Sequence, residues 1–170
     1  MRIRRKKLSE DLTLYFNNNY PKCINNKDNK IFTVILGIGG NIGDMFSRFD
    51  SLLKAIKNDT RINMLNTSPI LKNPPFGYTE QEYFYNAILK ISTNMTPLYL
   101  LNSIHKYEKR FGRKRTFKDA PRTMDIDIIF IQKNGKNIYF AHKDLKVPHI
   151  GWKVRDSVLI PLQYIDNNKI

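Results

Sequence analysis

The order of the hydrophobic segments between residues 31 and 131 is the feature that most restricts how this chain can fold. The segment IFTVILGIG, residues 31–39, is an apolar run that ends in glycines, which is typical of a buried strand. Asp44 is a suitable N-terminal cap for a helix whose apolar positions follow at helical spacing. Residues 62–71 and 83–93 have the composition and alternation of two further strands.

The second half of this region repeats the pattern of helix and strand. Thr96 followed by proline is a strong helix start, with a capping residue before a proline at the first helical position, and this helix is expected to stop at Gly112. Residues 122–131 form a fourth expected strand, a hairpin is expected at Asn134, and a last helical stretch follows Pro148. The order strand–helix–strand–strand–helix–strand is the split βαβ, or ferredoxin-like, plan. We therefore expect an α+β fold with a mainly antiparallel sheet, helices packed on one face and the other face free for ligands.

Residues 1–30 differ in composition from the rest of the chain. They hold eight Lys and Arg residues and three acidic residues, for a net charge of +5. We expect them to form a basic and polar N-terminal extension, with a short amphipathic helix around Leu8, Leu12 and Leu14, that precedes a single domain of residues 31–170.

The single cysteine and the hydropathy of the chain indicate which cellular compartment we expect. Cys23 is the only cysteine, which excludes an internal disulfide framework and fits a reducing compartment. The basic start has no apolar signal-peptide core after it, and no apolar run approaches the roughly 20 residues of a membrane helix. We expect a cytoplasmic protein.

Positive charge is concentrated rather than spread along the chain. Of the net charge of +14, residues 105–122 contribute +6. Such regions bind polyanions, which include nucleic acid, acidic lipid and the phosphates of a nucleotide, or they form a solvated surface that keeps a protein soluble. We favour the solvated surface for the extension and a phosphate-binding role for residues 105–122.

Two aspartates lie next to this second basic region. Asp125 and Asp127 are two positions apart on the fourth expected strand, so both carboxylates point to one face, roughly 7 Å apart. Such a pair suits Mg²⁺, with phosphate oxygens and waters completing the coordination, although the pair taken alone is better explained by pairing with surface arginines. The loop before them supplies cations: Arg113, Lys114, Arg115, Lys118 and Arg122. Carboxylates beside guanidinium groups favour a triphosphate site.

A second group of residues suits a flat heteroaromatic ring. Phe84 and Asn86 point the same way on the third strand, so Phe84 can stack on a ring while Asn86 reads its edge, and the preceding loop displays Phe76. The alternative is a core aromatic with a structural asparagine. On the second helix, His105 and Glu108 share a face and suit contacts with a nucleotide's sugar or base, unless they form a satisfied surface pair.

Four motifs in order resemble the hydroxymethyldihydropterin pyrophosphokinase family. They are GGN at 39–41, NPPFG with YFYN at 73–86, the segment from Glu108 to Phe130 that contains APRTMDIDIIF, and VPHIGWKVRDSVLIPL at 147–162. The resemblance implies a ferredoxin-like enzyme of folate biosynthesis that is ATP- and Mg²⁺-dependent. It would transfer pyrophosphate from ATP to 6-hydroxymethyl-7,8-dihydropterin and release AMP and the pterin diphosphate. It also implies a monomer with these small-molecule substrates and no nucleic-acid or membrane partner.

The resemblance further implies the role of each site residue. Two Mg²⁺ ions would be bound by Asp125 and Asp127, which would be catalytic together with Arg113, Arg115 and Arg122. The residues around ATP would be His105, Glu108, Arg113, Arg115, Arg122, Ile128, His149, Lys153 and Arg155. The pterin site would be lined by Asn73, Pro74, Phe76, Phe84 and Asn86.

The chain also departs from this family at particular positions. Gly40 replaces a serine of the turn, the basic loop lacks a tryptophan for which Phe117 is the nearest substitute, and Ser157 stands where an aromatic covers the second face of the pterin. A catalytically reduced homologue that only binds ATP is therefore one alternative. Another is an RNA-binding module of the same fold, but the sequence has no RNP-like motif and such a module has no use for two adjacent aspartates.

Overall fold

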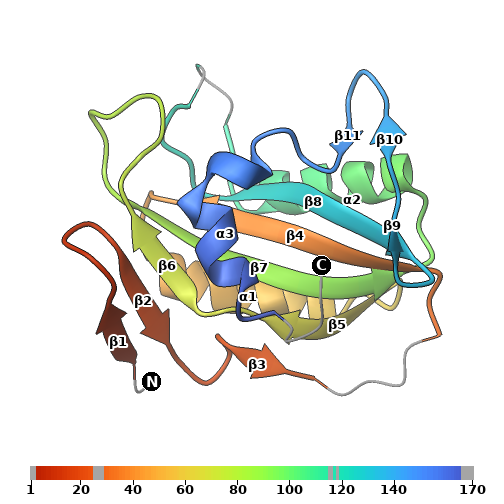
Figure 1. Cartoon of the computed structure of the whole chain (residues 1–170), viewed down its shortest axis with the longest axis horizontal. Coiled ribbons are helices and arrows are strands. Elements are labelled where there is room, and N and C mark those ends of the chain that lie inside the picture. Colours follow the sequence, from red (N-terminus) through yellow and green to blue (C-terminus); the bar gives the residue numbers. More distant parts are fainter. Residues whose placement is uncertain (1–2, 25–28, 115–116, 118, 166–170) are drawn as a thin grey trace.

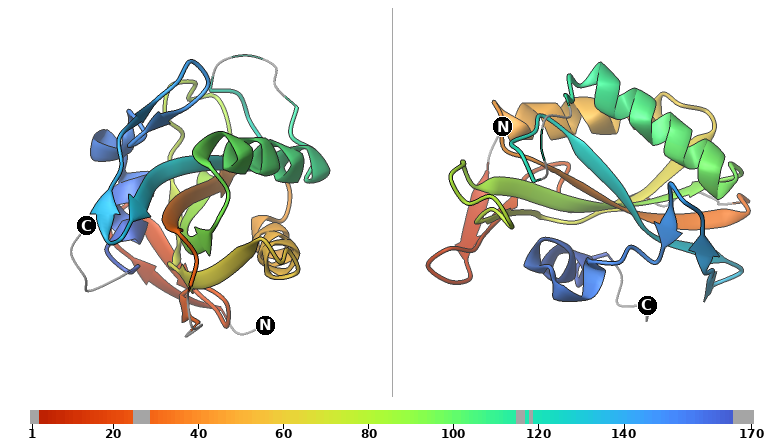
Figure 2. Two further views of the ribbon diagram at one scale, coloured as in Figure 1. Left: turned by 90° about the vertical axis from the view of Figure 1, so that its right-hand side faces the viewer. Right: turned by 90° about the horizontal axis from the view of Figure 1, so that it is seen from above.

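The structure is a computed structural model and describes residues 3–24, 29–114, 117 and 119–165. Its centre is one twisted sheet, and every strand pairing among these residues is antiparallel (Figure 1). Helices α1 (Met45–Lys57) and α2 (Pro97–Arg110) cover one face. The short helix α3 (Asp156–Leu162) lies on the other face (Figure 2). The expected α+β class is confirmed, and α3 is the one helix of the described chain that leaves the shared face.

Four strands make up the expected split βαβ core. Strand β4 (Phe32–Gly40) lies between β7 (Phe84–Thr93) and β8 (Asp125–Lys133), and β5 (Ile62–Thr67) pairs with the outer side of β7. The chain reaches these strands in the order predicted from the sequence, with α1 and α2 as the two crossovers.

The second predicted strand is divided in two. Strand β5 ends at Thr67 and β6 (Ile70–Asn73) begins after Pro69, although both pair with β7. Proline has no N–H to donate, so the ladder is interrupted at this point. The hydroxyl of Ser68 compensates because it accepts a hydrogen bond of 2.8 Å from the Ile88 amide.

The helices begin where their capping residues predict. The Asp44 side chain accepts a hydrogen bond from the Ser47 amide at 3.1 Å, which satisfies one free N–H of the first turn of α1. The predicted apolar stripe of α1 is buried, and its Phe49 and Leu52 are fully buried, each stabilising the fold by about 1.5–3 kcal/mol. Helix α2 begins at Pro97 and is ended by Gly112, whose φ of 79° is one that glycine adopts without strain.

The sheet separates a large core from a small one. Beneath α1 and α2, the large core includes Ile126 and Ile128 of β8 and Met124, which directly precedes this strand. On the other face, Ile129 and Phe130 join a smaller cluster with residues of α3. Side chains of β8 point alternately to the two faces of the sheet, and this alternation shifts here because a β-bulge lies opposite Ile35 and Leu36 of β4.

The N-terminal segment is part of the sheet, and the prediction of a short helix around residues 8–14 is wrong. Strands β1 (Arg4–Lys7) and β2 (Thr13–Phe16) form a hairpin, and β2 pairs with β6. Strand β3 (Lys22–Cys23) pairs with β5. The run TLYF is rich in β-formers, and burying Leu14 against the sheet outweighs a weak helical pattern. That residues 31–170 form a domain without this segment stays a prediction.

Small elements complete the far side of the sheet. Strand β9 (Lys136–Asn137) pairs with β8 through a turn in which Asn134 and Gly135 both have positive φ, as the sequence predicted. A separate pair, β10 (Phe140–Ala141) and β11 (Lys146–Val147), precedes the 3₁₀ helix η1 (Trp152–Val154). Within the described chain, no helix combines the length and the hydropathy needed to cross a membrane.

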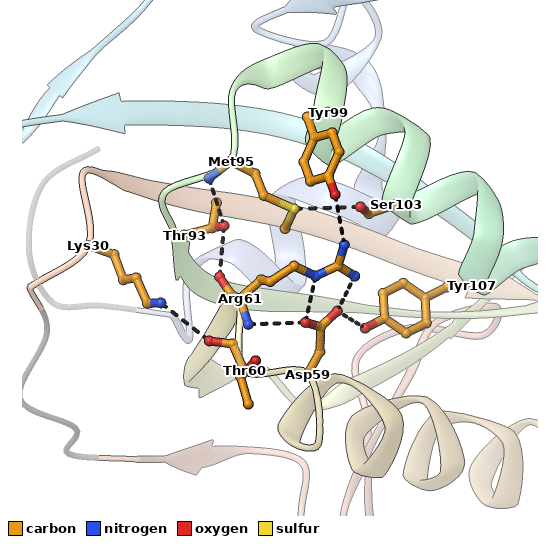
Figure 3. A network of polar contacts seen from close by, with 9 residues as sticks. All are labelled: Lys30, Asp59, Thr60, Arg61, Thr93, Met95, Tyr99, Ser103 and Tyr107. Atoms are coloured by element: carbon orange, nitrogen blue, oxygen red, sulfur yellow. Dashed lines mark hydrogen bonds and ion pairs between the residues drawn. The ribbon is translucent and has the colours of Figure 1, made fainter.

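A polar network joins the α1–β5 connection to α2. The Arg61 guanidinium donates two hydrogen bonds to Asp59, at 2.9 and 2.7 Å, and the Tyr107 hydroxyl donates a third at 2.8 Å (Figure 3). Arg61 also donates to the Tyr99 hydroxyl at 3.3 Å. The hydrogen bonds from Arg61 lower the pKa of Asp59 well below its usual range. The pKa of Tyr107 is raised, mainly because its side chain is buried and also because its hydroxyl donates to the Asp59 carboxylate.

Candidate active site

Asp125 and Asp127 lie side by side at the start of β8 and point to the face that carries α3. Their partners on β4 are glycines, Gly39 opposite Asp125 and Gly37 opposite Asp127, so the neighbouring strand brings no side chain against the carboxylates. The intervening Ile126 is buried in the core below α1 and α2. The predicted placement of both carboxylates on one face is therefore what the strand shows.

Two cavities meet at these aspartates. The first has a volume of about 260 Å³ and lies over the ends of β4, β6 and β7. The second has a volume of about 370 Å³ and lies between α2, β8 and the segment 143–150. The residues that line both are Arg113, Asp125, Asp127 and His149. The boundary between the two cavities is thus formed by charged and titratable side chains.

The first cavity gathers most of the residues predicted to bind a pterin. They are Asn73, Phe76, Phe84 and Asn86. The Asn86 amide donates a hydrogen bond of 2.7 Å to the Asn73 side chain, and a Cβ on Gly39 would overlap the Asn86 oxygen, so only glycine leaves room for this amide. Pro74 is outside the lining of this cavity and lines a neighbouring one.

Arginines hold Asp125 from two sides. Arg122 donates to Asp125 Oδ2 at 2.6 Å and Arg113 donates to Asp125 Oδ1. The Arg122 guanidinium also lies 5.2 Å from the centre of the Phe84 ring, within the range of a cation–π contact. Arg122 therefore connects the aromatic wall of the first cavity with the carboxylates.

The Glu108 side chain is buried and binds other groups of the protein. The residue is 4% exposed, and its carboxylate accepts a hydrogen bond of 2.9 Å from the Ile126 amide and pairs with Arg113. Burial raises the pKa of Glu108, while the Ile126 amide opposes this effect. Glu108 lines the second cavity, but both of its described polar contacts fix Arg113 and β8 in place.

The two aspartates differ in how their charge is balanced. Asp125 is paired with two arginines, whereas the pKa of Asp127 is raised, first by burial and then by the neighbouring charge of Asp125. A divalent cation would relieve this repulsion. The described chain has no cluster of three or more His, Cys, Asp or Glu side chains placed to hold a metal. Two carboxylates nevertheless fit Mg²⁺, which uses one or two together with substrate phosphates and water.

The residues predicted to surround ATP are divided between the cavities. His105 and Ile128 line the second cavity, and Arg155 lines the first, with its guanidinium 5.3 Å from the Phe76 ring centre. Lys153 is not among the described residues that line these two cavities, and its ammonium lies 5.6 Å from the centre of the Trp152 ring. Arg115 lies outside the described residues.

Asn41 joins three loops around the site, a role that its place in the GGN motif did not predict. Its side-chain oxygen accepts a hydrogen bond of 2.9 Å from the Arg122 amide, and its amide group donates to the Gln81 side chain at 2.9 Å and to the Glu82 carbonyl at 3.0 Å. The adjacent Gly40 is packed so closely that a Cβ there would lie 2.8 Å from the Thr123 carbonyl oxygen. This contact accounts for glycine instead of serine at position 40.

The loop of residues 74–83 also contacts the basic loop, residues 113–122, directly. We call residues 74–83 the pterin loop after the role that the sequence predicts for them. Gln81 donates a hydrogen bond of 2.9 Å to the Asp119 carbonyl, and the Tyr78 ring packs edge-on against Phe117 at 5.3 Å. Asp119 lines the first cavity, and Lys143 and Asp144 line the second. The sequence did not single out these three residues, because isolated polar residues in loops carry no periodic signal.

Comparison with known proteins gives a consistent result. The model of the family described as 7,8-dihydro-6-hydroxymethylpterin-pyrophosphokinase (HPPK) matches residues 35–167. Proteins named 2-amino-4-hydroxy-6-hydroxymethyldihydropteridine pyrophosphokinase from Campylobacter jejuni and Helicobacter pylori are each 42% identical to this chain. The matches cover 79% of this chain and 83% of the first relative, and 76% of this chain and 78% of the second. The folic acid synthesis protein FOL1 of Dictyostelium discoideum is 38% identical over 91% of this chain but only 22% of its own length.

Proposed function

The chain belongs to the 7,8-dihydro-6-hydroxymethylpterin-pyrophosphokinase family, and from that premise we propose that its two cavities are the pterin site and the ATP site. The enzyme transfers pyrophosphate from ATP to 6-hydroxymethyl-7,8-dihydropterin in folate biosynthesis. The observation that carries the assignment is that Asp125 and Asp127 line both cavities, so two substrates bound there meet at the carboxylates.

The first cavity is the proposed pterin site. Phe84 supplies an aromatic wall, and the amides of Asn73 and Asn86 supply both donors and acceptors for the edge of a pterin. Phe76, which is 64% exposed, stands on the pterin loop at the side of the cavity. Most of the other residues that line this cavity are polar or charged, so a heteroaromatic ring can be held there both by stacking and by hydrogen bonds.

The second cavity is the proposed ATP site. His105 and Ile128 are placed to contact the nucleoside, while Arg113 and His149 lie where the cavity reaches the aspartates. The phosphates would therefore extend toward Asp125 and Asp127. Arg155 and Arg122 approach the same point from the first cavity, and we propose that Arg115 and Lys153 also contact the phosphates of bound ATP.

We propose that Asp125 and Asp127 hold magnesium, as two ions, against the phosphates. Bound Mg²⁺ would neutralise phosphate charge and orient the β-phosphorus for in-line attack. Both carboxylates are hard oxygen donors. Burial, and after it the charge of Asp125, raises the pKa of Asp127, and a bound cation would reduce the repulsion between the two carboxylates.

The side chains themselves position the reactants and stabilise charge. The pterin hydroxymethyl oxygen forms a bond to the β-phosphorus while the bond from that phosphorus to the α-phosphate oxygen breaks. AMP leaves with that oxygen, and the hydroxyl proton is released to solvent. Arg113 and Arg122 are already fixed by Glu108 and Asp125, so they offer oriented donors to the phosphate oxygens without reorganisation during the reaction. Enclosing both substrates converts the encounter into a reaction between oriented partners.

The setting of the enzyme is also a proposal. Its substrates are small molecules, and we propose that it acts as a cytoplasmic monomer without a nucleic-acid or membrane partner. Its positive charge then serves phosphate binding and solubility.

Variants in each cavity test the assignment of the two sites. Asn86→Ala should raise the KM for the pterin about tenfold, from the loss of hydrogen bonds to the ring edge, and leave the KM for ATP unchanged. His105→Ala should raise the KM for ATP alone. Glu80→Ala, at an exposed position of the pterin loop, is the control and should change neither constant. If Asn86→Ala raised only the KM for ATP, the two assignments would be wrong.

A further inference from the structure

A third cavity adjoins the proposed pterin site. It has a volume of about 320 Å³ and lies between the start of the pterin loop, residues 154–157 and the tip of the N-terminal hairpin, which contributes Ser9, Asp11 and Leu12. It shares four lining residues with the first cavity: Asn73, Phe76, Arg155 and Ser157. The hairpin therefore stands next to the pterin site, although the family match begins only at residue 35.

The hairpin is attached to both ends of the pterin loop. Before the loop, β2 pairs with β6, with Thr13 opposite Lys72 and Leu14 opposite Leu71, and β6 ends at Asn73. At the other end of the loop, the Tyr83 hydroxyl donates a hydrogen bond of 2.7 Å to Asp11 Oδ1. A loop held at both ends by the same element has fewer conformations than one held at a single end.

The position of this loop sets the shape of the pterin site. The loop carries Phe76, which lines both the first and the third cavity and lies against Arg155. Of the four residues that line both cavities, Ser157 is small, so Asn73, Phe76 and Arg155 supply the large side chains between them, and Phe76 is the one that the loop carries. A displaced loop would open the pterin site toward the hairpin.

We propose that the N-terminal hairpin, residues 4–16, positions the pterin loop, with Asp11 acting on the pterin site through Tyr83. Asp11 is a positioning residue for the pterin and has no role toward ATP. The inference rests on the proposed assignment of the first cavity as the pterin site. The competing explanation is that the hairpin only covers the edge of β6, as native sheets commonly require.

A double-mutant cycle in the full-length protein separates these explanations. Asp11→Ala and Tyr83→Phe each remove the hydrogen bond and should each raise the KM for the pterin about threefold to tenfold, with kcat and the KM for ATP within twofold of wild type. The double variant should be no worse than either single variant, because both lose the same contact. Asp11→Asn keeps an acceptor oxygen and should restore the wild-type KM.

Two controls make the result decisive. Glu10→Ala removes the neighbouring exposed charge on the hairpin and should leave both KM values unchanged. Thermal unfolding of each variant identifies any loss of stability, and a fall in Tm with unchanged KM values would show that the hairpin only covers the sheet edge.

The outcome also distinguishes this inference from the proposed function. If Asn86→Ala raises the KM for the pterin while Asp11→Ala and Tyr83→Phe do not, the pterin site stands and the role of the hairpin is refuted. If Asn86→Ala leaves that KM unchanged, the first cavity is not the pterin site, and the inference falls with the assignment.

Discussion

Arg122 is the residue at which the two halves of the site depend on each other. Its guanidinium pairs with Asp125 and lies over the Phe84 ring, so one side chain touches both the proposed metal ligand and the proposed pterin wall. Its backbone is held in turn by the Asn41 side chain, which also fixes the pterin loop. The geometry of Arg122 is therefore set by loops from three parts of the sequence.

The loss of this guanidinium should impair turnover more than folding. We expect Arg122→Ala to lower kcat by about 10²- to 10³-fold, the cost of removing one preorganised charge donor. Steady-state AMP release measures the effect. Arg110→Ala removes the same formal charge from an exposed position on α2 and should leave kcat unchanged. Equal losses in the two variants would mean that net charge matters and the position of Arg122 does not.

At the scale of elements, the Asp59–Arg61–Tyr107 network holds α2 to the connection that follows α1. Because Arg61 lowers the pKa of Asp59 in the folded protein, the unfolded chain takes up this proton first as the pH falls. The stabilisation is therefore complete above about pH 4, the ordinary pKa of aspartate, and is lost progressively as the pH falls below it.

Asp59→Asn tests this network. The variant should lower the free energy of unfolding by about 1 kcal/mol at pH 7, a modest value because the Arg61 side chain is 43% exposed. The difference from wild type should shrink below about pH 4. Denaturant unfolding at both pH values measures it, with Glu80→Gln as the control. A deficit that stayed constant with pH would contradict the ionic origin of the effect.

The elements that the sequence predicted are those whose signal is local. The pattern of apolar residues predicted β4, β7 and β8, and the capping residues predicted the starts of α1 and α2. Each of these signals depends only on residues close by in the sequence. The hairpin of β1 and β2 was missed because its stability comes from β6, and Leu14 pairs with Leu71, a partner far along the chain. No local pattern carries that information.

The site was predictable to the same extent. The spacing of Asp125 and Asp127 was enough to place both carboxylates on one face of β8. The pairing of Asp125 with Arg113, the inward turn of Glu108 and the bridge made by Asn41 all depend on how loops approach one another in space. Nearest neighbours in the sequence do not determine those approaches.

At the scale of the whole molecule, the large hydrophobic core and the aspartate carboxylates lie on opposite faces of the sheet. The large core below α1 and α2 lies on one face, whereas the first cavity lies above the other face, where glycines of β4 leave space for the carboxylates. The second cavity reaches the same carboxylates from between α2 and β8. The central claim is that a pterin in one cavity and ATP in the other react across Asp125 and Asp127.

The most direct measurement of this claim is AMP release from ATP in the presence of Mg²⁺, with and without 6-hydroxymethyl-7,8-dihydropterin. The account predicts AMP and the pterin diphosphate only when the pterin is present, no detectable turnover in Asp125→Ala or Asp127→Ala, and wild-type turnover in the Glu80→Ala control. Near-normal rates in either aspartate variant, with the protein folded, would contradict it.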